Sequence, residues 1–466
     1  MDMFRKKEIR SIADSNVRLL RCLSAFDLTF LGVGAIIGAG IFVITGIVAA
    51  TESGPSIVLS YIMAGFACAF SALAYAELAA SIGGCGSAYG YAYAGFGELF
   101  AWIVGWDLLL EYAISVSAVS VGWSGYCNDL LMTLNIHVPN YLLHGPATGG
   151  YFNMLAVVII IFLGTLLTIG VKSSSRANNF MVAIKLMVLA LFIVIASMNV
   201  DPKNWSPFLP FGWSGVMQGA ALIFFAYIGF DAVSTAAEEA INPQRDLPIG
   251  IIGSLAICTL IYIVVAGLLT GVVPYTVLNV PSPVSHTLLL LGYKTAAGLV
   301  GVGAVAGLTT VMLVLYYGLS RVFLAMARDG LLPNFFAVTN QKTHTPIRII
   351  VLCGVLMATG AALVPLDDLT ELVNVGTLFA FMIVCTGVII LRYTHPKLPR
   401  PFKTPLMPYV PILGVISCGY LLINLPWVTM VRFVVWMVIG MVIYFSWGYK
   451  NSSKKIARLQ ETADKF

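Results

Sequence analysis

The scarcest feature of this 466-residue chain is charge. Only 10% of its residues are charged, whereas a typical soluble domain carries about 25%. Hydrophobic residues make up 59% of the chain, and the mean hydropathy is +0.92. This composition excludes a water-soluble globular protein, and it excludes a disordered chain, which needs low hydrophobicity and high charge. It indicates an all-α protein embedded in a membrane.

Cysteine and histidine are also scarce. The eight cysteines stand one at a time in apolar stretches, with no CxxC pair, and the five histidines all fall between the apolar segments. This spacing excludes a disulfide scaffold and favours no metal site or cofactor. Residues 1–25 contain basic side chains but no short apolar core followed by a cleavage site. We therefore expect a cytosolic segment at the membrane surface there, and no signal peptide.

Long apolar runs are abundant. About 20 apolar residues cross the hydrocarbon core as a helix, and proline, glycine, asparagine and charge clusters divide the chain into twelve such runs. The expected spans are residues 26–50, 54–81, 97–127, 152–172, 177–199, 214–239, 248–273, 295–327, 346–365, 371–392, 407–425 and 429–449.

The basic residues divide unevenly between the two sides of these spans. With the N-terminus inside, the cytoplasmic side receives 22 of the 26 Lys and Arg residues, which agrees with the positive excess of cytoplasmic loops. Lys203 and Lys294 fall in outside loops, Arg432 lies near the outer end of the last span, and Lys185 lies inside the span 177–199. The net charge of +5 thus reports orientation in the cell membrane, with both termini cytoplasmic, and we expect no nucleic-acid partner.

Two spans are interrupted. The first reads GVGAIIGAGIFVITG around Gly38, Ala39 and Gly40, and the sixth reads ALIFFAYIGFDAVSTAAEEA with Gly229 and Asp231 in an apolar run. Glycine adopts backbone angles that other residues avoid. Because the two spans are five apart, they cross in opposite directions, and glycine-broken segments in corresponding positions of inverted halves indicate a midplane site of a secondary transporter. Close packing of small residues is the alternative for the first span alone.

Broken helices in a membrane leave backbone groups that a ligand can satisfy. The half-helix beginning near Gly40 offers N–H groups and a positive dipole end, which suit a carboxylate. Carbonyls freed at Ile36, Phe225, Ala226 and Ile228 suit an ammonium. A pocket with both sites describes an α-amino acid, and the Phe225 ring stands where it can close over the substrate.

Ionisable residues inside spans mark functional sites by default. Lys185 lies about two turns inside its span; burial disfavours the charged form of a lysine, so it can carry the coupling proton, with its ammonium bridging the broken first helix. A structural lysine held by a carboxylate or by carbonyls is the alternative. Glu111 and Asp231 either receive a basic substrate side chain, hold a proton or cap the backbone. Asp107 precedes Glu111 by one turn. Glu77 falls near the end of its span and is expected to be an interfacial or gating charge.

The side-chain pocket draws its candidates from two spans. Ser115 follows Glu111 by one turn, and Met312, Leu315 and Tyr316 come from the span 295–327. The bulky apolar candidates favour a small neutral substrate, whereas Glu111 and Asp231 favour Arg or Lys.

Several stretches carry a family resemblance: GAIIGAGIFV, GVKSSSRANN, FFAYIGFDAVSTAAEEAINPQRDLPIGI, LSRVFLAMARDGLLP, ELVNVGTLFAFMIV and LPRPFKTPLMPYVPILG. Through them the chain resembles the cationic amino acid transporter family of the amino acid-polyamine-organocation superfamily. The resemblance implies a five-plus-five inverted repeat with discontinuous helices 1 and 6. The repeats are residues 26–199 and 214–392, followed by two extra helices in 407–449 and a cytosolic tail, 450–466. Animal members of the family commonly carry two further helices. With twelve spans, the chain resembles a bacterial member, and we expect it in the cell inner membrane.

The resemblance also implies roles for individual residues. The carboxylate-binding motif matches Gly38, Ala39 and Gly40, the amine-binding carbonyls match Ile36, Phe225, Ala226 and Ile228, and the aromatic gate matches Phe225. The fifth-helix lysine that takes the place of sodium matches Lys185, and acidic pocket positions match Glu111 and Asp231. The prediction is a monomeric, proton-coupled symporter that imports L-amino acids by alternating access. The alternative is an amino acid exchanger, and neither an enzyme nor a channel is expected, since no nucleophile, metal set or selectivity filter is visible.

Overall fold

The computed structural model describes residues 23–82, 88–169, 175–237, 239–340, 343 and 345–452, without the side chains of residues 175–177 and 235. The predictions for residues 1–22, for the tail beyond residue 452 and for the stretch 170–174 lie outside this range. Within it the protein is helical, and the pairing outside helices is an isolated bridge between Leu23 and Ala240. The all-α prediction is therefore confirmed.

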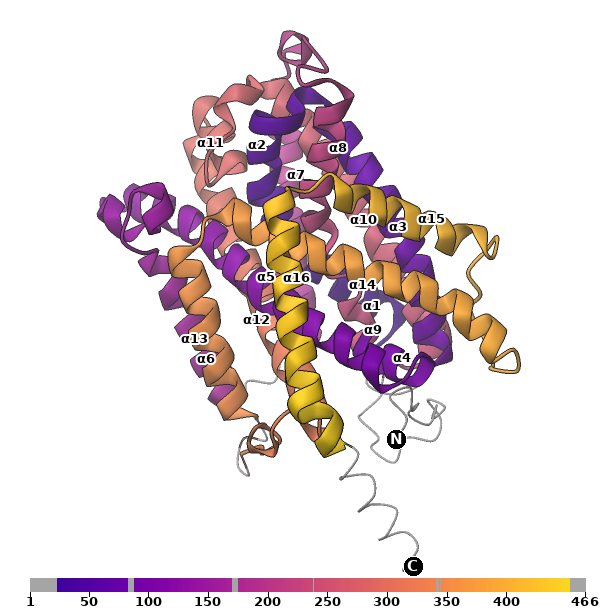
Figure 1. Ribbon diagram of the computed structural model, residues 1–466. Coiled ribbons are helices and arrows are strands. Elements are labelled where there is room, and N and C mark those ends of the chain that lie inside the picture. The colour runs from indigo at the N-terminus through magenta and orange to yellow at the C-terminus, as the bar shows by residue number, and fades with distance from the viewer. Residues whose placement is uncertain are drawn as a thin grey trace, which may run out of the picture.

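The longer elements are α-helices, joined in places by short π or 3-10 turns (Figure 1). In chain order the α-helices are α1 (Ala25–Ile36), α2 (Thr45–Val48), α3 (Ile57–Ser81), α4 (Ala88–Gly95), α5 (Glu98–Thr133), α6 (Met154–Ile169), α7 (Ser175–Ser197), α8 (Gly212–Ile223), α9 (Ala232–Thr235), α10 (Pro243–Val272), α11 (Pro283–Leu290), α12 (Lys294–Arg328), α13 (Ile347–Leu363), α14 (Leu366–Thr394), α15 (Tyr409–Ile423) and α16 (Trp427–Ile443). The turns that matter below are η1 (Gly40–Ile44) and η7 (Phe224–Tyr227).

Eight helical segments of the described chain are long and apolar enough to cross a membrane, and four further apolar helices are shorter: α1, α6, α13 and α15. Some boundaries differ from the expected spans. Helix α5 continues to Thr133, and α10 begins at Pro243, because a proline is tolerated in the first turn of a helix. The short helices α4 and α11 were not expected, since eight residues are too few for a spanning window.

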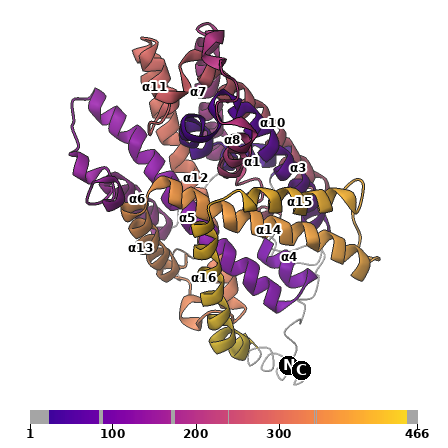
Figure 2. The same cartoon turned by 45° about the horizontal axis from the view of Figure 1, so that its top comes forward.

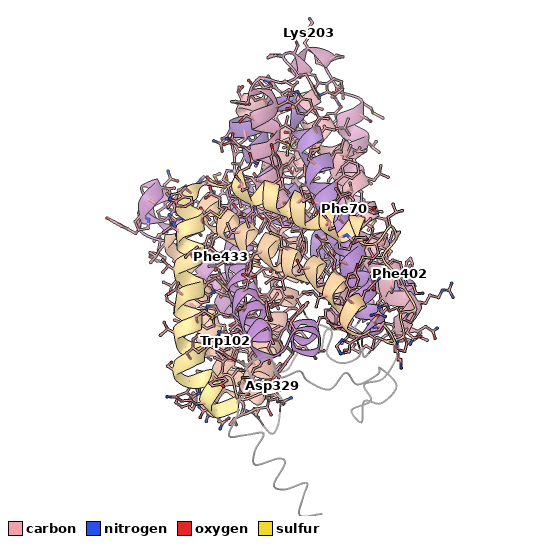
Figure 3. All side chains as sticks on the ribbon, turned by 45° about the vertical axis from the view of Figure 1, so that its right-hand side comes forward. Phe70, Trp102, Lys203, Asp329, Phe402 and Phe433 are labelled. Carbon is pink, nitrogen blue, oxygen red and sulfur yellow. The ribbon has the colours of Figure 1, made fainter. Side chains whose placement is uncertain are left out.

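The helices form an elongated bundle. Helices α6 and α13 pack together on one side, whereas α14 runs through the middle, where it contacts α3, α5 and α15 (Figures 1 and 2). Helix α16 lies against α5 through stacked indoles, with Trp106 and Trp436 ring centroids 4.4 Å apart. Gly440 leaves room for this contact, because a Cβ there would lie 2.4 Å from Trp106. Lys203 and Asp329 lie at opposite ends of the bundle (Figure 3).

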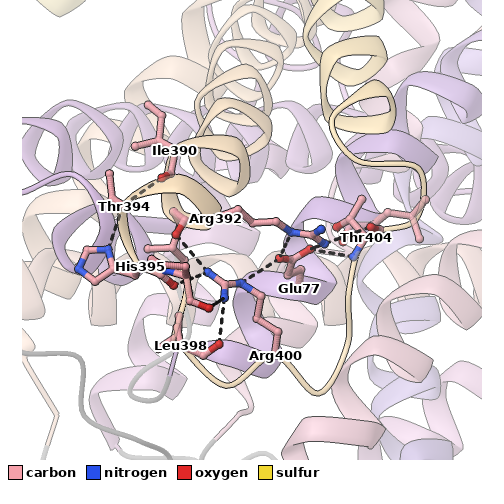
Figure 4. A network of polar contacts seen from close by, with 11 residues as sticks. Glu77, Ile390, Arg392, Thr394, His395, Leu398, Arg400 and Thr404 are labelled. Atoms are coloured by element: carbon pink, nitrogen blue, oxygen red, sulfur yellow. Dashed lines mark hydrogen bonds and ion pairs between the residues drawn. The ribbon is translucent and has the colours of Figure 1, made fainter.

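A buried ionic network closes one end of α3. Glu77 is only 2% exposed. Its carboxylate accepts hydrogen bonds from Arg392 at 2.9 and 2.7 Å and from the backbone N–H of Thr404 at 2.7 Å, and Arg400 Nε lies 3.5 Å away (Figure 4). This network ties α3 to the end of α14 and to the segment that leads to α15. Glu77 lies one turn before the end of α3, and its role as an interfacial or gating charge stays a prediction.

Candidate functional site

The first helix break lies between α1 and η1. A capping box of Ser24 and Asp27 starts α1, and the helix ends where Ile37 takes an extended conformation with ψ of 99°. Helical bonding resumes with Phe42 N–H donating to the Gly38 carbonyl at 3.3 Å. The N–H groups just before Phe42 therefore precede the first i to i−4 bond of the new helix and have no acceptor within it.

The second break lies between η7 and α9. Helix α8 tightens into the 3-10 turn η7, Ile228 is extended, and Gly229 has a φ of +122° that a residue with a side chain rarely adopts. The chain becomes helical again after Asp231, the residue at the N-cap of α9.

The two breaks touch each other through their glycines. A Cβ on Gly40 would lie 2.3 Å from Ala226 Cα, and a Cβ on Gly229 would lie 2.9 Å from the Ala35 carbonyl carbon. Neither position has space for a side chain. The sequence predicted that these glycines interrupt the helices. The structure shows in addition that they allow the backbones of the two unwound segments to come into direct contact.

Tyr262 of α10 joins the same two segments. Its hydroxyl lies 2.8 Å from the Ile36 carbonyl and 3.0 Å from the Ala226 carbonyl, and the side chain is fully buried. The Phe225 carbonyl accepts from Ile228 N–H at 3.3 Å. Each carbonyl has two lone pairs, so these oxygens retain capacity for a further donor. Their binding of a substrate amine stays a prediction.

Lys185 of α7 lies beside the first break. Its Nζ donates to the carbonyls of Gly34 at 2.7 Å and Ile37 at 3.1 Å, and the side chain has no exposed surface. Gly307 of α12 makes room for the lysine stem, since a Cβ there would lie 2.9 Å from Lys185 Cε. The ammonium thus holds carbonyls on both sides of the α1 terminus. Whether it exchanges a proton stays a prediction.

The acidic candidates lie on α5 and at the second break. Glu111 and Ser115 are each 1% exposed, and Asp231 is 6% exposed. Tyr112 donates to Asp231 Oδ2 at 3.3 Å, whereas Glu111 Oε1, Ser115 Oγ and Asp231 Oδ1 have no hydrogen-bond partner among the described residues. The roles of these three residues in binding stay predictions.

Helix α12 contributes a face that the sequence did not identify. Val311 approaches the first break, where a Cβ on Gly38 would lie 3.3 Å from Val311 Cγ2. Leu315 follows on the same face one turn later, and Met312 is fully buried. Tyr316 does not join the site, because its hydroxyl donates to the Ile350 carbonyl of α13 at 2.5 Å. The phase of an apolar helix cannot be read from its sequence when all faces are apolar.

The apolar helices of the described chain define a multi-pass membrane protein. A family model described as amino acid permease matches residues 23–447. The chain belongs to the amino acid permease family.

Individual relatives cover most of the chain. The Branched-chain amino acid permease BcaP of Bacillus subtilis (strain 168) is 49% identical over 458 residues, which are 97% of this chain and 98% of the relative. The Methylthioribose transporter of the same bacterium is 47% identical over 454 residues, with the same coverage. Human Cationic amino acid transporter 4 is 37% identical over 407 residues, 84% of this chain and 64% of the relative. The resemblance to cationic amino acid transporters is confirmed.

Proposed function

We propose that this protein imports an L-amino acid by alternating access, with proton coupling through Lys185. The observation that carries the proposal is the meeting of two helix breaks, one of which is held by the buried ammonium of Lys185. A break in a membrane helix persists where a ligand, water or protein group satisfies its backbone. Here the opposed breaks form a ligand site that a conformational change can open to either side.

The substrate is bound by its backbone groups. N–H groups at Gly38, Ala39 and Gly40 receive the carboxylate at the start of η1, where the helix dipole favours negative charge. The carbonyls of Ile36, Phe225, Ala226 and Ile228 receive the ammonium. The Phe225 side chain, 6% exposed, closes over the site. Glu111, Ser115, Asp231, Met312 and Leu315 surround the substrate side chain.

Coupling follows from the two carbonyls that Lys185 holds. When protonated, Lys185 links Gly34 to Ile37 across the end of α1. After proton release the neutral amine keeps only two N–H donors and no charge, so its hold on the carbonyls weakens. The break can then change shape and release the substrate. Binding of proton and substrate therefore favours the same conformation.

Transport by purified protein in proteoliposomes tests the coupling. We expect an inward proton gradient to accelerate uptake of labelled amino acid, and Lys185→Ala to abolish this dependence. Lys203→Ala is the matched control, because Lys203 is an exposed lysine at the far end of the bundle. If the gradient leaves wild-type uptake unchanged, the coupling is wrong. Uptake that occurs only into vesicles preloaded with amino acid would identify an exchanger.

A competition assay identifies the side chain that the substrate carries. The relatives are named for branched-chain amino acids, methylthioribose and cationic amino acids, so the panel contains Ala, Ser, Leu, Arg, Lys and methylthioribose. We expect an amino acid to compete best, since methylthioribose has neither a carboxylate nor an ammonium. Competition by Arg and Lys alone would assign Glu111 and Asp231 to a cationic side chain, and competition by methylthioribose alone would contradict the amino acid assignment.

The proposal includes the membrane topology. It comprises twelve crossings, two inverted repeats in residues 26–199 and 214–392, extra helices in 407–449 and cytoplasmic termini, in a protein that acts as a monomer in the cell membrane. The unequal division of Lys and Arg between the two sides supports this orientation.

A further inference from the structure

Asn374 of α14 is a buried polar residue that the transport mechanism above does not use. It has no exposed surface. Its Nδ2 donates to the carbonyls of Ala221 at 2.9 Å and Leu222 at 3.0 Å, both in the last turn of α8. An amide NH2 group has two donors, so each carbonyl receives one of them. Oδ1 has no partner among the described residues, and the reverse orientation would point it at two other acceptors.

The two carbonyls that Asn374 binds lie where α8 unwinds. In a continued α-helix they would accept from the N–H groups of Phe225 and Ala226, four residues further along the chain. The helix instead tightens into η7 at Phe224, and Ile228 is extended. The last carbonyls of a helix lack partners within it, and the Asn374 amide supplies donors to two of them. It therefore fixes the point at which the second break begins.

Lys185 makes the same kind of contact at the first break. Its Nζ donates to the carbonyl of Gly34, in the last turn of α1, and to that of Ile37, the residue at the C-cap of α1. Both side chains that donate, one at each break, are fully buried. In the proposed topology α7 is the fifth span of residues 26–199, and α14 is the fifth span of residues 214–392. The two side chains therefore occupy corresponding places in the two inverted halves.

The contacts at the two breaks differ in charge. A lysine ammonium can release a proton, whereas an asparagine amide is neutral and does not titrate. With the N-terminus in the cytoplasm, α1 lies on the cytoplasmic side of the first break, and α8 lies on the outer side of the second break. Proton release from Lys185 therefore weakens the hold on the cytoplasmic half-helix alone. Asn374 holds the outer half-helix in the same way before and after this step.

We infer that Asn374 is a positioning residue of the substrate site and the neutral counterpart of Lys185 in the second half of the molecule. Through Ala221 and Leu222 it fixes the start of the unwound segment. It thereby sets the positions of the Phe225 ring and of the carbonyls that receive the substrate ammonium. This inference rests on the proposed function, in which those groups bind the substrate and Lys185 carries the proton. Because Asn374 exchanges no proton, it acts on substrate binding and not on coupling.

Uptake of labelled amino acid by Asn374→Leu in proteoliposomes tests this role, because leucine branches at Cγ as asparagine does and its side chain has no hydrogen-bond donor. We expect the KM to rise about tenfold, which corresponds to about 1.4 kcal/mol, and kcat to stay within about twofold of wild type. The ratio of uptake with an inward proton gradient to uptake without one should equal that of wild type. Lys185→Ala, in contrast, should lose the gradient dependence.

Thr370→Val is the matched control. Thr370 lies on α14 one turn before Asn374 and is 2% exposed, and its hydroxyl donates to the Asp367 carbonyl of its own helix. It should keep the wild-type KM. A lower kcat of Asn374→Leu with an unchanged KM would show that Asn374 only stabilises the fold, and this result would overturn the inference. An altered gradient dependence of Asn374→Leu would overturn the separation of binding from coupling.

Asn374→Asp keeps the role testable if Asn374→Leu does not fold. Its carboxyl group has the shape of the amide but offers one donor when neutral and none when ionised, so the KM should rise here too. Equal KM values of Asn374→Asp and wild type would contradict the positioning role. If wild-type uptake does not respond to the proton gradient, the proposed coupling is wrong, and the KM comparison still decides the role of Asn374.

Discussion

At the scale of single residues, the Tyr262 hydroxyl holds the two helix breaks together. Replacement of Tyr262 by Phe leaves the Ile36 and Ala226 carbonyls without this donor, and a buried unsatisfied acceptor costs about 1–3 kcal/mol. We expect a lower melting temperature for Tyr262→Phe. Since the substrate ammonium can satisfy both carbonyls, added substrate should raise the melting temperature of this variant by more than it raises that of wild type.

Tyr316→Phe is the control at this scale, because it also removes a hydroxyl that donates to a carbonyl, at Ile350 on α13, away from the breaks. It should melt lower without a larger response to substrate. Equal substrate responses of the two variants would show that the ammonium does not use these carbonyls. The sequence predicted both breaks from their glycines, yet it did not identify Tyr262, because the contact joins residues separated by 36 and 226 positions.

At the scale of helices, the apolar runs and the glycines of the sequence were sufficient to locate most helices. The way these helices pack against one another was not predictable from the sequence. Lys185 was recognisable because a charge inside an apolar run is rare. Val311 was not, because α12 is apolar around most of its circumference and only the fold selects the face that meets Gly38. The ion pairs of Glu77 were not predictable, because its arginine partners are more than 300 residues away in the chain.

The Glu77 network is expected to hold the end of α3 against α14. Glu77→Gln removes the negative charge and leaves Arg392 and Arg400 without compensation. Removal of one partner from a buried ion pair costs about 3–5 kcal/mol, and we expect less than this because the Arg392 side chain is 25% exposed. Thermal unfolding of the purified protein measures the effect. Arg432→Gln is the control: its pair with Asp368 is 43% and 39% exposed, so it should contribute no more than about 1 kcal/mol.

At the scale of the whole molecule, the distribution of charge predicts the orientation in the membrane. Lys203 and Lys397 are both exposed, and the division of Lys and Arg residues assigns the first to the outside and the second to the cytoplasm. Each is replaced singly by Cys in a background without Cys22, Cys85 and Cys127. The cysteines that remain are buried: Cys68, Cys258, Cys353, Cys385 and Cys418. A membrane-impermeant maleimide should label Lys203→Cys in intact cells and Lys397→Cys only after permeabilisation. Labelling of Lys397→Cys in intact cells, and of Lys203→Cys only after permeabilisation, would show the opposite orientation. Protons would then enter from the opposite end of the bundle.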